Sequence, residues 1–294
     1  MTDQAPIRDN RLLLGRAVKE RILEDVRLYT DANPDIPSLV SVLIGDTPEA
    51  AVYVRNQARS AEAAGFPFKE EYWPAGISQD ECKARILKMN DDPHILGVIL
   101  QRPVPEHINV RSLQSAIHPL KDVEGMNPAS IGNIVYSDVA LAPCTAAASV
   151  ELIKETGLQL AGLEVVMIGH SEIVGKPVAM MLMAEGCTVT VCHHLTRSVA
   201  MHTRRADVVV VAVGKAHLIG PDMIKPGAAV IDIGINQIET AEGTKIVGDV
   251  DTNAVKEVAG WITPVPGGVG PVTVAVLMRN GIVAHQRQKA AGWL

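Results

Sequence analysis

The sequence predicts an α/β protein of two domains, the second built on a doubly wound parallel sheet. The length of 294 residues fits roughly two domains of about 100–200 residues each. In the first half, short apolar runs alternate with helix-like segments, which is typical of a parallel sheet covered by helices. In the second half, strands that are apolar on both faces alternate with helices, and the first strand runs into a glycine-bearing turn.

The first half is expected to begin with a helix at about 16–32 and a buried strand over 38–45. An amphipathic helix over 53–66 follows, closed by Gly65. Ser78 and Glu81 have capping-box spacing at the start of a helix over 78–91. The other expected elements are a strand over 69–74, a strand over 95–105 that runs into a proline-rich loop, a short helix over 109–117 and a loop over 118–128.

A new unit is expected near residue 143, because Pro143 and Thr145 suit the start of a helix and Gly157 suits its end. Strands are expected over 163–169, 187–194, 204–214 and 228–236, and a final helix over about 272–288. The predicted domains are therefore 1–145, which the C-terminal helix 272–294 joins, and 146–271.

Composition excludes several classes of protein. The net charge of -6 and the absence of a long basic run disfavour nucleic-acid binding. No apolar stretch reaches the length of a membrane span, and the charged N-terminal segment does not resemble a secretory signal, so we expect a cytoplasmic protein. The four cysteines form no CxxC pair and the nine histidines no HExxH motif, so no metal site is expected.

Several stretches could carry chemistry. Gly169, Ser171 and Gly175 follow a strand, where glycines let backbone N–H groups approach a phosphate, but a plain tight turn explains them equally well. The acidic residue that would bind a ribose 2′-hydroxyl is missing after the second strand, which ends in His193 and His194.

Three glycines and three prolines within 262–273 predict a shaped loop, itself neither helix nor strand, that opens a helix and presses its backbone on a ligand, with an ordinary stiff linker as the alternative. Gln101 stands at the carboxyl end of a parallel strand, where such sheets bind ligands, although a lone glutamine at that position is more often a residue that caps the loop. Asp122 and Glu124, taken by spacing alone, are interpreted as a solvated acidic turn. Tyr53 and Gln57 are four residues apart and share one face of the predicted helix. They serve either as packing residues or as part of a binding site.

Together these stretches resemble the bifunctional methylenetetrahydrofolate dehydrogenase/methenyltetrahydrofolate cyclohydrolase family, in the family's order from about residue 8 to 285. The segments that carry the resemblance include SVLIGDTPEAAVYVRNQ, GVILQRPVPEHIN, IHPLKDVEGMNP, VVMIGHSEIVGKPVAMML and ITPVPGGVGPVTVAVLM. The resemblance implies a folate-binding domain, a Rossmann-like domain, an active site in the cleft between them and a homodimer formed through the Rossmann-like domains. It also implies hydride transfer from 5,10-methylenetetrahydrofolate to a nicotinamide, followed by hydrolysis of the methenyl product.

The resemblance implies a catalytic set of Tyr53, Gln57, Gln101 and Glu124. The family's helix reads Tyr-x-x-x-Lys, and Gln57 stands where the lysine relays protons. A carboxamide cannot act as a general acid or base. We therefore expect dehydrogenase activity to survive and cyclohydrolase activity to be lost or severely reduced. The alternatives are a fully bifunctional enzyme and a catalytically silent folate- or nucleotide-binding paralogue.

Substrate contacts are implied for a larger set of residues: Tyr53, Leu100, Gln101, Arg102, Glu124, Pro266, Gly267, Gly268, Val269 and Gly270, with 266–270 as a loop that closes over the substrate. Glu124 replaces the family's pterin-binding aspartate, and Arg102 replaces an apolar residue. Either these two side chains pair or Arg102 meets the substrate. Tetrahydrofolate remains the expected one-carbon carrier.

Cofactor contacts are implied for five residues: Gly169, His170, Ser171, His194 and Ile235. His170 and His194 stand where the family has an arginine and a serine that hold the NADP 2′-phosphate. Neutral histidines carry no permanent positive charge, which favours NAD. The alternative is that protonated histidines bind the 2′-phosphate, in which case NADP preference strengthens below about pH 6.5.

Overall fold

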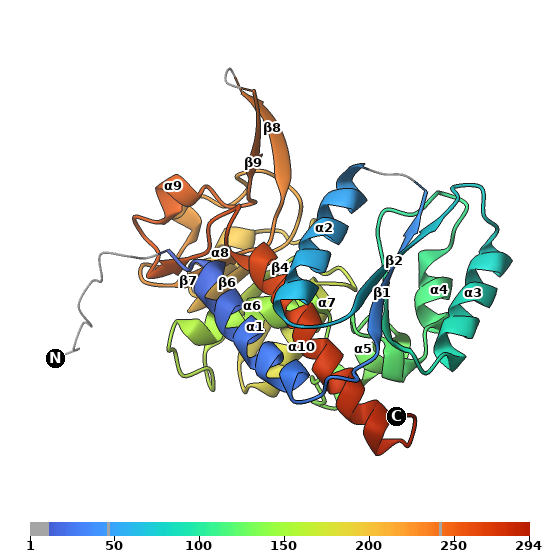
Figure 1. The fold of residues 1–294 in the computed structure, drawn as a ribbon. Coiled ribbons are helices and arrows are strands. Elements are labelled where there is room, and N and C mark those ends of the chain that lie inside the picture. Colours follow the sequence, from blue (N-terminus) through green and yellow to red (C-terminus); the bar gives the residue numbers. More distant parts are fainter. Residues whose placement is uncertain (1–11, 46–47, 241–242) are drawn as a thin grey trace. The chain divides into compact units, whose positions relative to one another are not determined.

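The computed structural model describes residues 12–45, 48–240 and 243–294, and Figure 1 traces its helices and strands. The chain forms two compact units. Residues 12–18 and Thr145–Val272 make up one unit, which we call the nucleotide unit. Lys19–Cys144 and Thr273–Leu294 make up the other, which we call the N-terminal unit. The expected first domain began at residue 1, whereas Leu12 bridges Ile262 and Leu13 donates its backbone N–H to the Ile262 carbonyl, so this segment joins the nucleotide unit.

The N-terminal unit contains a parallel sheet of β1 (Ser38–Ile44), β2 (Phe68–Trp73) and β3 (Ile95–Leu100), in the order β2-β1-β3. Every residue of β1 and β3 is buried, as the continuous apolar runs SLVSVLI and ILGVIL predict for strands covered on both faces. The carboxyl end of β3 delivers Gln101, whose backbone N–H still bonds to Val42 of β1.

The helices of this unit begin where local capping predicts. Ser78 accepts the Glu81 backbone N–H at the start of α3 (Gln79–Asp91), whereas the Glu81 carboxylate pairs with Arg85. The other helical elements are α1 (Gly15–Asp31), α2 (Pro48–Ala63), α4 (Val110–Ala116), the 3-10 turn η1 (Pro119–Lys121) and α5 (Pro128–Val135). The segment 118–128 was expected to be a loop, and η1 is a short helical turn within it.

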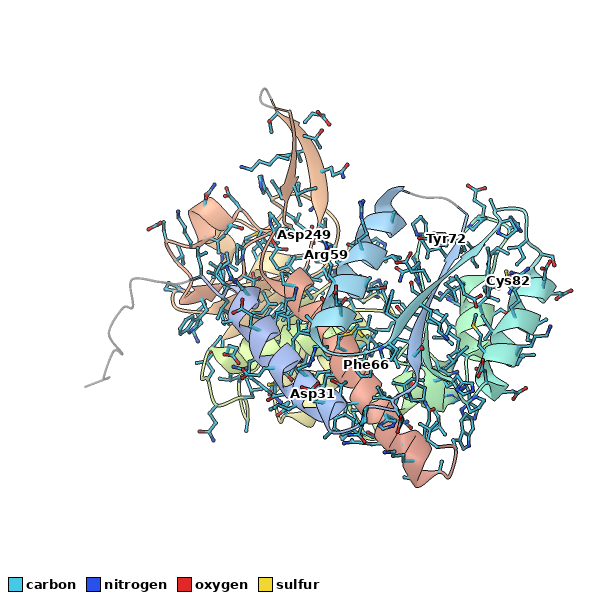
Figure 2. All side chains as sticks on the ribbon, in the orientation of Figure 1. Asp31, Arg59, Phe66, Tyr72, Cys82 and Asp249 are labelled. Carbon is cyan, nitrogen blue, oxygen red and sulfur yellow. The ribbon has the colours of Figure 1, made fainter. Side chains whose placement is uncertain are left out.

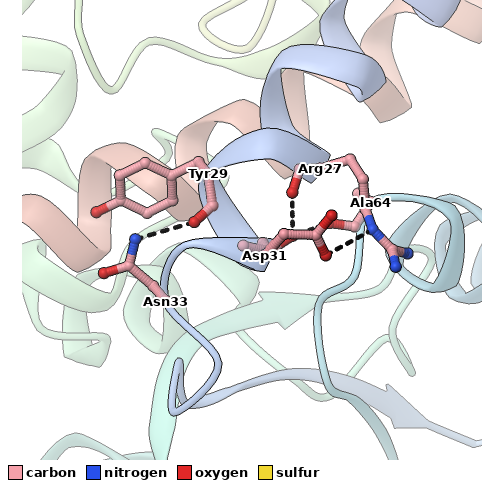
Figure 3. A network of polar contacts seen from close by, with 6 residues as sticks. Arg27, Tyr29, Asp31, Asn33 and Ala64 are labelled. Atoms are coloured by element: carbon pink, nitrogen blue, oxygen red, sulfur yellow. Dashed lines mark hydrogen bonds and ion pairs between the residues drawn. The ribbon is translucent and has the colours of Figure 1, made fainter.

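A buried hydroxyl joins the ends of α1 and α2 (Figure 3). Thr30 Oγ1 donates to the Ala64 carbonyl at 2.6 Å and lies 3.0 Å from the Arg27 carbonyl. Gly65 follows with a φ of +74°, and a Cβ there would lie 2.6 Å from the Thr30 hydroxyl. The predicted helix stop at Gly65 therefore has two causes, the left-handed backbone and the close approach of α1.

The nucleotide unit is built on a five-stranded parallel sheet of order β10-β7-β6-β4-β5. Its strands are β4 (Glu164–Ile168), β5 (Thr188–Cys192), β6 (Val208–Val211), β7 (Ala229–Asp232) and β10 (Trp261–Ile262). The chain passes from β4 to β5 on one side and then to β6 on the other, so the strand order reverses at β4. Such a reversal creates the crevice at the carboxyl ends of strands where open α/β sheets bind ligands, and the doubly wound fold class is confirmed.

Helices and turns connect these strands. They are α6 (Cys144–Glu155), α7 (Gly175–Ala184), α8 (Val199–Thr203), the 3-10 turn η2 (Pro221–Met223) and α9 (Thr252–Val255). An antiparallel hairpin of β8 (Asn236–Thr240) and β9 (Gly243–Val247), which the sequence did not predict, projects from the unit (Figure 1). The side chains of the hairpin are largely exposed, so its sequence has no apolar run from which the two strands could be predicted.

The final helix, α10 (Val269–Ala290), begins earlier than the predicted 272. In its later turns, Gln288 donates to the carbonyls of Leu96 and Leu120, and Asn280 donates to that of Val123. These bonds satisfy carbonyls of the β3 and η1 region, so the helix completes the N-terminal unit. Within the described ranges, no helix is both long enough and apolar enough to cross a lipid bilayer.

Candidate functional site

Two carboxamides meet at the carboxyl end of β3 in the N-terminal unit. Gln101 Nε2 donates to Gln57 Oε1 at 2.6 Å and lies 3.0 Å from Ser41 Oγ. Gln57 and Gln101 are 8% and 6% exposed, and Ser41 is fully buried on β1. Hydrogen bonding fixes both amides, and no member of this trio is an acid or base near neutral pH.

Tyr53 lies one turn before Gln57 on α2 and is 50% exposed. The helix therefore turns the Gln57 amide inward and leaves the Tyr53 ring half exposed to solvent. A half-exposed aromatic ring beside a fixed polar pair suits the flat face of a heterocyclic ligand.

Glu124 brings a titratable carboxyl to the same strand end. Its Oε2 accepts the backbone N–H of Leu100 at 2.8 Å. Burial raises the pKa of Glu124 to about 7, while the Leu100 bond and the positive charge of Arg102 act to lower it. The sequence left open a pairing of Arg102 with Glu124; in the described part of the chain they form no ion pair, and Arg102 is exposed.

The interpretation of Asp122 and Glu124 as a solvated turn is wrong. Asp122 is 2% exposed and accepts the N–H groups of Met126 and Asn127 and the Ser130 hydroxyl, at 3.0, 2.7 and 2.6 Å. Burial raises the pKa of Asp122, and these donors act to lower it. Asp122 therefore builds the turn into α5, and Glu124 is the member of the pair that lies beside Leu100.

Neighbouring buried groups hold the same loop in place. Lys121 is 1% exposed, and its Nζ donates to the carbonyls of Met89 and Asp92 at 2.8 and 2.6 Å. Asn280 donates to the carbonyls of Val123 and Ala142 at 2.9 and 3.2 Å. Sequence reasoning missed Asn280, although a lone asparagine in the apolar run VAVLMRNGIV was a usable signal.

In the nucleotide unit, Gly169, Ser171 and Gly175 form one turn between β4 and α7. Gly169 has a φ of +112°, and a Cβ on Gly169 or Gly175 would collide with backbone carbonyl oxygens. Ser171 Oγ accepts the N–H groups of Val174 and Gly175 at 3.2 and 3.4 Å. This tight strand–turn–helix lies at the reversal point of the sheet, which is the geometry of a dinucleotide site.

Three histidines gather at the ends of β4 and β5. The ring centroids of His170 and His193 are 4.8 Å apart, with planes inclined by 29°. The ring of His194 lies 6.3 Å from that of His170 and 5.9 Å from that of His193. Sequence reasoning named His170 and His194 as cofactor contacts and left out His193.

Two buried aspartates anchor the segments that follow β6 and β7. Asp249 accepts the N–H groups of Val213, Gly214 and Lys215 at 2.7, 3.0 and 2.8 Å. It also accepts from Asn236 Nδ2 at 2.9 Å, and Figure 2 places it at the base of the β8–β9 hairpin. Ile235, a predicted cofactor contact, is 58% exposed beside this anchor.

Asp232 is the second of these aspartates. It accepts the N–H groups of Gly234, Asp249 and Val250 at 2.9, 3.1 and 2.8 Å. Burial raises the pKa of Asp232 to about 6, while its backbone donors act to lower it. A Cβ on Gly234 would collide with the Asp249 carboxylate, and a Cβ on Gly248 would collide with that of Asp232. Sequence reasoning assigned neither aspartate a role.

The segment 266–270 is only partly a loop. Val269 and Gly270 lie in the first turn of α10, which corrects the expectation that 262–273 contains no helix. Gly267 has a φ of +107°, and its carbonyl accepts the Gly15 N–H at 2.9 Å. Among the described residues, no group of three or more histidine, cysteine or acidic side chains is placed to hold a metal ion.

Comparison with known proteins gives consistent matches over almost the whole chain. Residues 13–124 match the model of the tetrahydrofolate dehydrogenase/cyclohydrolase catalytic domain, and residues 143–289 match that of the tetrahydrofolate dehydrogenase/cyclohydrolase NAD(P)-binding domain. The bifunctional protein FolD 3 of Roseobacter denitrificans is 78% identical over 288 residues, which cover 98% of this chain and 99% of the relative.

Solved structures agree. The bifunctional FolD methylenetetrahydrofolate dehydrogenase/cyclohydrolase of Campylobacter jejuni is 36% identical with a TM-score of 0.89, over 94% of this chain and 99% of that one. The methylenetetrahydrofolate dehydrogenase-cyclohydrolase of Trypanosoma brucei, solved with NADP and an inhibitor, is 33% identical with a TM-score of 0.86, over 98% of this chain and 99% of that one.

Proposed function

The chain belongs to the tetrahydrofolate dehydrogenase/cyclohydrolase family, and we propose that it is a 5,10-methylenetetrahydrofolate dehydrogenase whose cyclohydrolase activity is lost or severely reduced. The observation that carries the proposal is the buried pair Gln57–Gln101. It offers hydrogen bonds for positioning and no proton for transfer.

The two steps make different demands on this pair. Oxidation removes a hydride, with both bonding electrons, from the one-carbon bridge, and a bound nicotinamide accepts it. For that step the chain's side chains must orient the substrate and exclude water, which fixed amides can do. In hydrolysis, water attacks the methenyl carbon and must lose a proton. A positioned acid–base group contributes about 10²–10⁴-fold to such a step, and neither amide can supply it.

The substrate contacts proposed in the N-terminal unit all lie on or beside the fixed pair. Tyr53 presents its half-exposed ring to the pterin, Leu100 and Gln101 form the floor, and Glu124 accepts the pterin N–H donors. Arg102, which is exposed, is assigned to the substrate rather than to an ion pair with Glu124. Residues 266–270 stay proposed as further substrate contacts.

The proposed cofactor contacts are the turn residues Gly169 and Ser171, the strand-end residues His170 and His194, and Ile235. Their support is the strand reversal at β4 and the tight turn that opens α7. We propose NAD as the preferred acceptor at neutral pH and above, because no arginine or lysine stands at positions 170, 193 or 194.

Full bifunctionality is the competing proposal, and two observations favour it. Glu124 is an acid with a pKa raised to about 7 at the same strand end, where an acid–base group works best near the operating pH. The Roseobacter relative is named as bifunctional. In this second proposal Glu124 takes the proton that the amides cannot.

A homodimer through the nucleotide unit is also proposed. Its support is that β5 is an edge strand of the sheet and that Val191, Leu195 and Met201 are 41%, 74% and 64% exposed. Sedimentation of the chain beside a Leu195→Asp, Met201→Asp variant tests it, with a monomeric double variant and a dimeric parent expected.

The test of function follows the two steps separately in one cuvette. Reduced nicotinamide reports dehydrogenation, and the decay of added methenyltetrahydrofolate, above its background rate, reports hydrolysis. We expect the first signal without the second. Robust hydrolysis supports the bifunctional proposal and overturns the proposal of a dehydrogenase without cyclohydrolase activity. Loss of both signals identifies a binding protein.

A further inference from the structure

Strand β1 carries a hydroxyl at a position where its neighbours are apolar. Successive side chains of a strand alternate between the two faces of a sheet. Val40 and Val42 pack into the hydrophobic core that also contains residues of α3 and α4. Leu43, on the opposite face, packs against Val54 of α2. Ser41 shares the face of Leu43 and is fully buried, so its hydroxyl lies on the α2 side of the sheet.

The strand itself does not account for this serine. A β-branched apolar residue suits the middle of a strand that is buried on both faces better than serine does. A hydroxyl buried without a hydrogen bond destabilises a protein, so buried hydroxyls are paired. The partner of Ser41 is a site residue, because Gln101 Nε2 donates to Ser41 Oγ at 3.0 Å.

This bond completes the set of contacts that hold Gln101. The backbone N–H of Gln101 donates to the carbonyl of Val42, the residue after Ser41, at 2.9 Å. The side-chain nitrogen has two hydrogens, and its second acceptor is Gln57 Oε1 at 2.6 Å. The last torsion of a glutamine side chain is broad and nearly two-fold, so it does not by itself distinguish nitrogen from oxygen. The two acceptors therefore set which end of the Gln101 amide faces β1 and α2.

The orientation leaves one polar atom of the amide for a ligand. Within the part of the chain that the structure describes, both acceptors are bonded to Gln101 Nε2, and no group donates to Gln101 Oε1. A carbonyl oxygen accepts hydrogen bonds, so Oε1 suits an N–H donor of a bound heterocycle. Glu124, which accepts the Leu100 N–H, is a second acceptor at the same strand end.

We propose that Ser41 is a positioning residue of the folate site, which holds the Gln101 carboxamide with its nitrogen toward β1 and α2 and its oxygen toward the ligand. Ser41 acts through Gln101 and does not itself touch the ligand. Without the hydroxyl the amide turns freely, and a ligand must order it on binding. Ordering one side chain lowers affinity by about threefold to tenfold. The inference rests on the proposed function insofar as this site binds a folate.

Threonine and valine at position 41 provide a matched pair, because they have nearly the same shape and only threonine has a hydroxyl. Binding of tetrahydrofolate to the full chain is measured by calorimetry, and KM is measured for methylenetetrahydrofolate and for the dinucleotide. Ser41→Val should raise the Kd for tetrahydrofolate and the KM for methylenetetrahydrofolate by about threefold to tenfold. Ser41→Thr should stay close to the parent, and the KM for the dinucleotide should be unchanged in both variants.

Two further variants separate positioning from stability. Ser41→Ala removes the hydroxyl without adding volume, so it should weaken folate binding as valine does even if valine overfills the strand. Ser149→Ala removes a buried hydroxyl of α6 that donates to the Thr145 carbonyl at 2.8 Å, and it should keep the parent's folate constants. Neither Kd nor KM depends on the fraction of the sample that is folded, so a purely structural loss would leave both unchanged.

The possible outcomes are distinct. Folate constants equal to the parent's in the valine and alanine variants overturn the inference. Equal weakening by threonine and valine assigns the effect to packing and also overturns it. If the parent binds tetrahydrofolate but transfers no hydride, the proposed function fails, and the Kd values still decide the role of Ser41. Failure of the parent to bind tetrahydrofolate overturns both.

Discussion

The amide nitrogen of Gln101 lies 2.6 Å from the amide oxygen of Gln57, and both side chains are buried. The contact joins the carboxyl end of β3 to the middle of α2, and Ser41 of β1 contributes a second acceptor. Three elements thus hold one amide nitrogen. A side chain introduced at position 57 is therefore presented to Gln101, whose amide can turn its oxygen toward a new donor.

Gln57→Lys should create hydrolytic activity. An amine at this position supplies the missing acid–base group, so we expect the cyclohydrolase rate to rise by about 10²–10⁴-fold, with dehydrogenation close to that of the parent. Asn56→Lys is the matched control, because it adds the same charge on the exposed side of α2. Equal hydrolysis rates in the two variants would contradict the prediction.

Glu124 should give folate binding a pH dependence. Burial raises its pKa to about 7, so the carboxyl ionises as the pH rises through neutrality and becomes the better acceptor for pterin N–H donors. The KM for methylenetetrahydrofolate should fall between pH 6 and 8 in the parent and stay flat in Glu124→Gln. Glu106→Gln, an exposed control, should keep the parent's profile.

The same carboxyl should make folding stability depend on pH. Its folded pKa of about 7 lies above the ordinary value of 4.5 for a glutamate side chain, so the folded chain holds this proton more tightly. The Glu124 contribution is therefore present at low pH and is lost as the pH rises from about 4.5 to 7. Urea unfolding should show Glu124→Gln gaining stability relative to the parent over this window, and a constant difference would refute the assignment.

Asp249→Asn should loosen the segments after β6 and β7. The carboxylate receives three backbone N–H bonds and one from Asn236, and hydrogen bonds to a charged group are worth about 1.5–3 kcal/mol each. We expect a loss of at least about 2 kcal/mol in urea unfolding and a higher KM for the dinucleotide. Asp222→Asn, at an exposed ion pair with Arg204, should change stability by less than about 0.5 kcal/mol.

Two glycines of the segment 266–270 should respond in opposite ways to alanine. A Cβ on Gly268 would lie 2.7 Å from both the Pro264 carbonyl oxygen and the Thr263 Cβ, whereas one on Gly270 meets open space in the first turn of α10. Gly268→Ala should cost about 1–3 kcal/mol through overpacking, and Gly270→Ala should be neutral or slightly stabilising. Thermal unfolding compares them directly, and equal losses would contradict this assignment.

The strands were predictable because burial on both faces leaves a continuous apolar run. Ile95–Leu100 and Val208–Val211 need no tertiary information to be recognised. The helix α5 was missed although Asn127 and Pro128 carry its N-cap signal, since the preceding acidic residues favoured a loop. The β8–β9 hairpin was missed because its exposed strands have no apolar alternation to detect.

Site residues were predictable where a motif fixed them and not where folding created the contact. Gln57 and Gln101 are 44 positions apart, and family resemblance, not spacing, brought them together. Asp122 was misread because its burial depends on the Ser130 hydroxyl and on backbone donors that only the folded turn supplies. His193 entered the cofactor region only when β4 and β5 placed its ring on His170.

The reciprocal fit of Asp232 with Gly248 and of Asp249 with Gly234 has a consequence for recombining this chain with its relatives. The Asp249 carboxylate occupies the space that a side chain at Gly234 would need, and the Asp232 carboxylate occupies the space that a side chain at Gly248 would need. A substitution at one of these four positions is therefore tolerated only together with a matching change at its partner. A chimera with its crossover between 234 and 248 takes half of the arrangement from each parent. Such a chimera should fold its nucleotide unit if both parents carry the same residues at these four positions. If the parents differ there, the crossover should be placed outside 234–248.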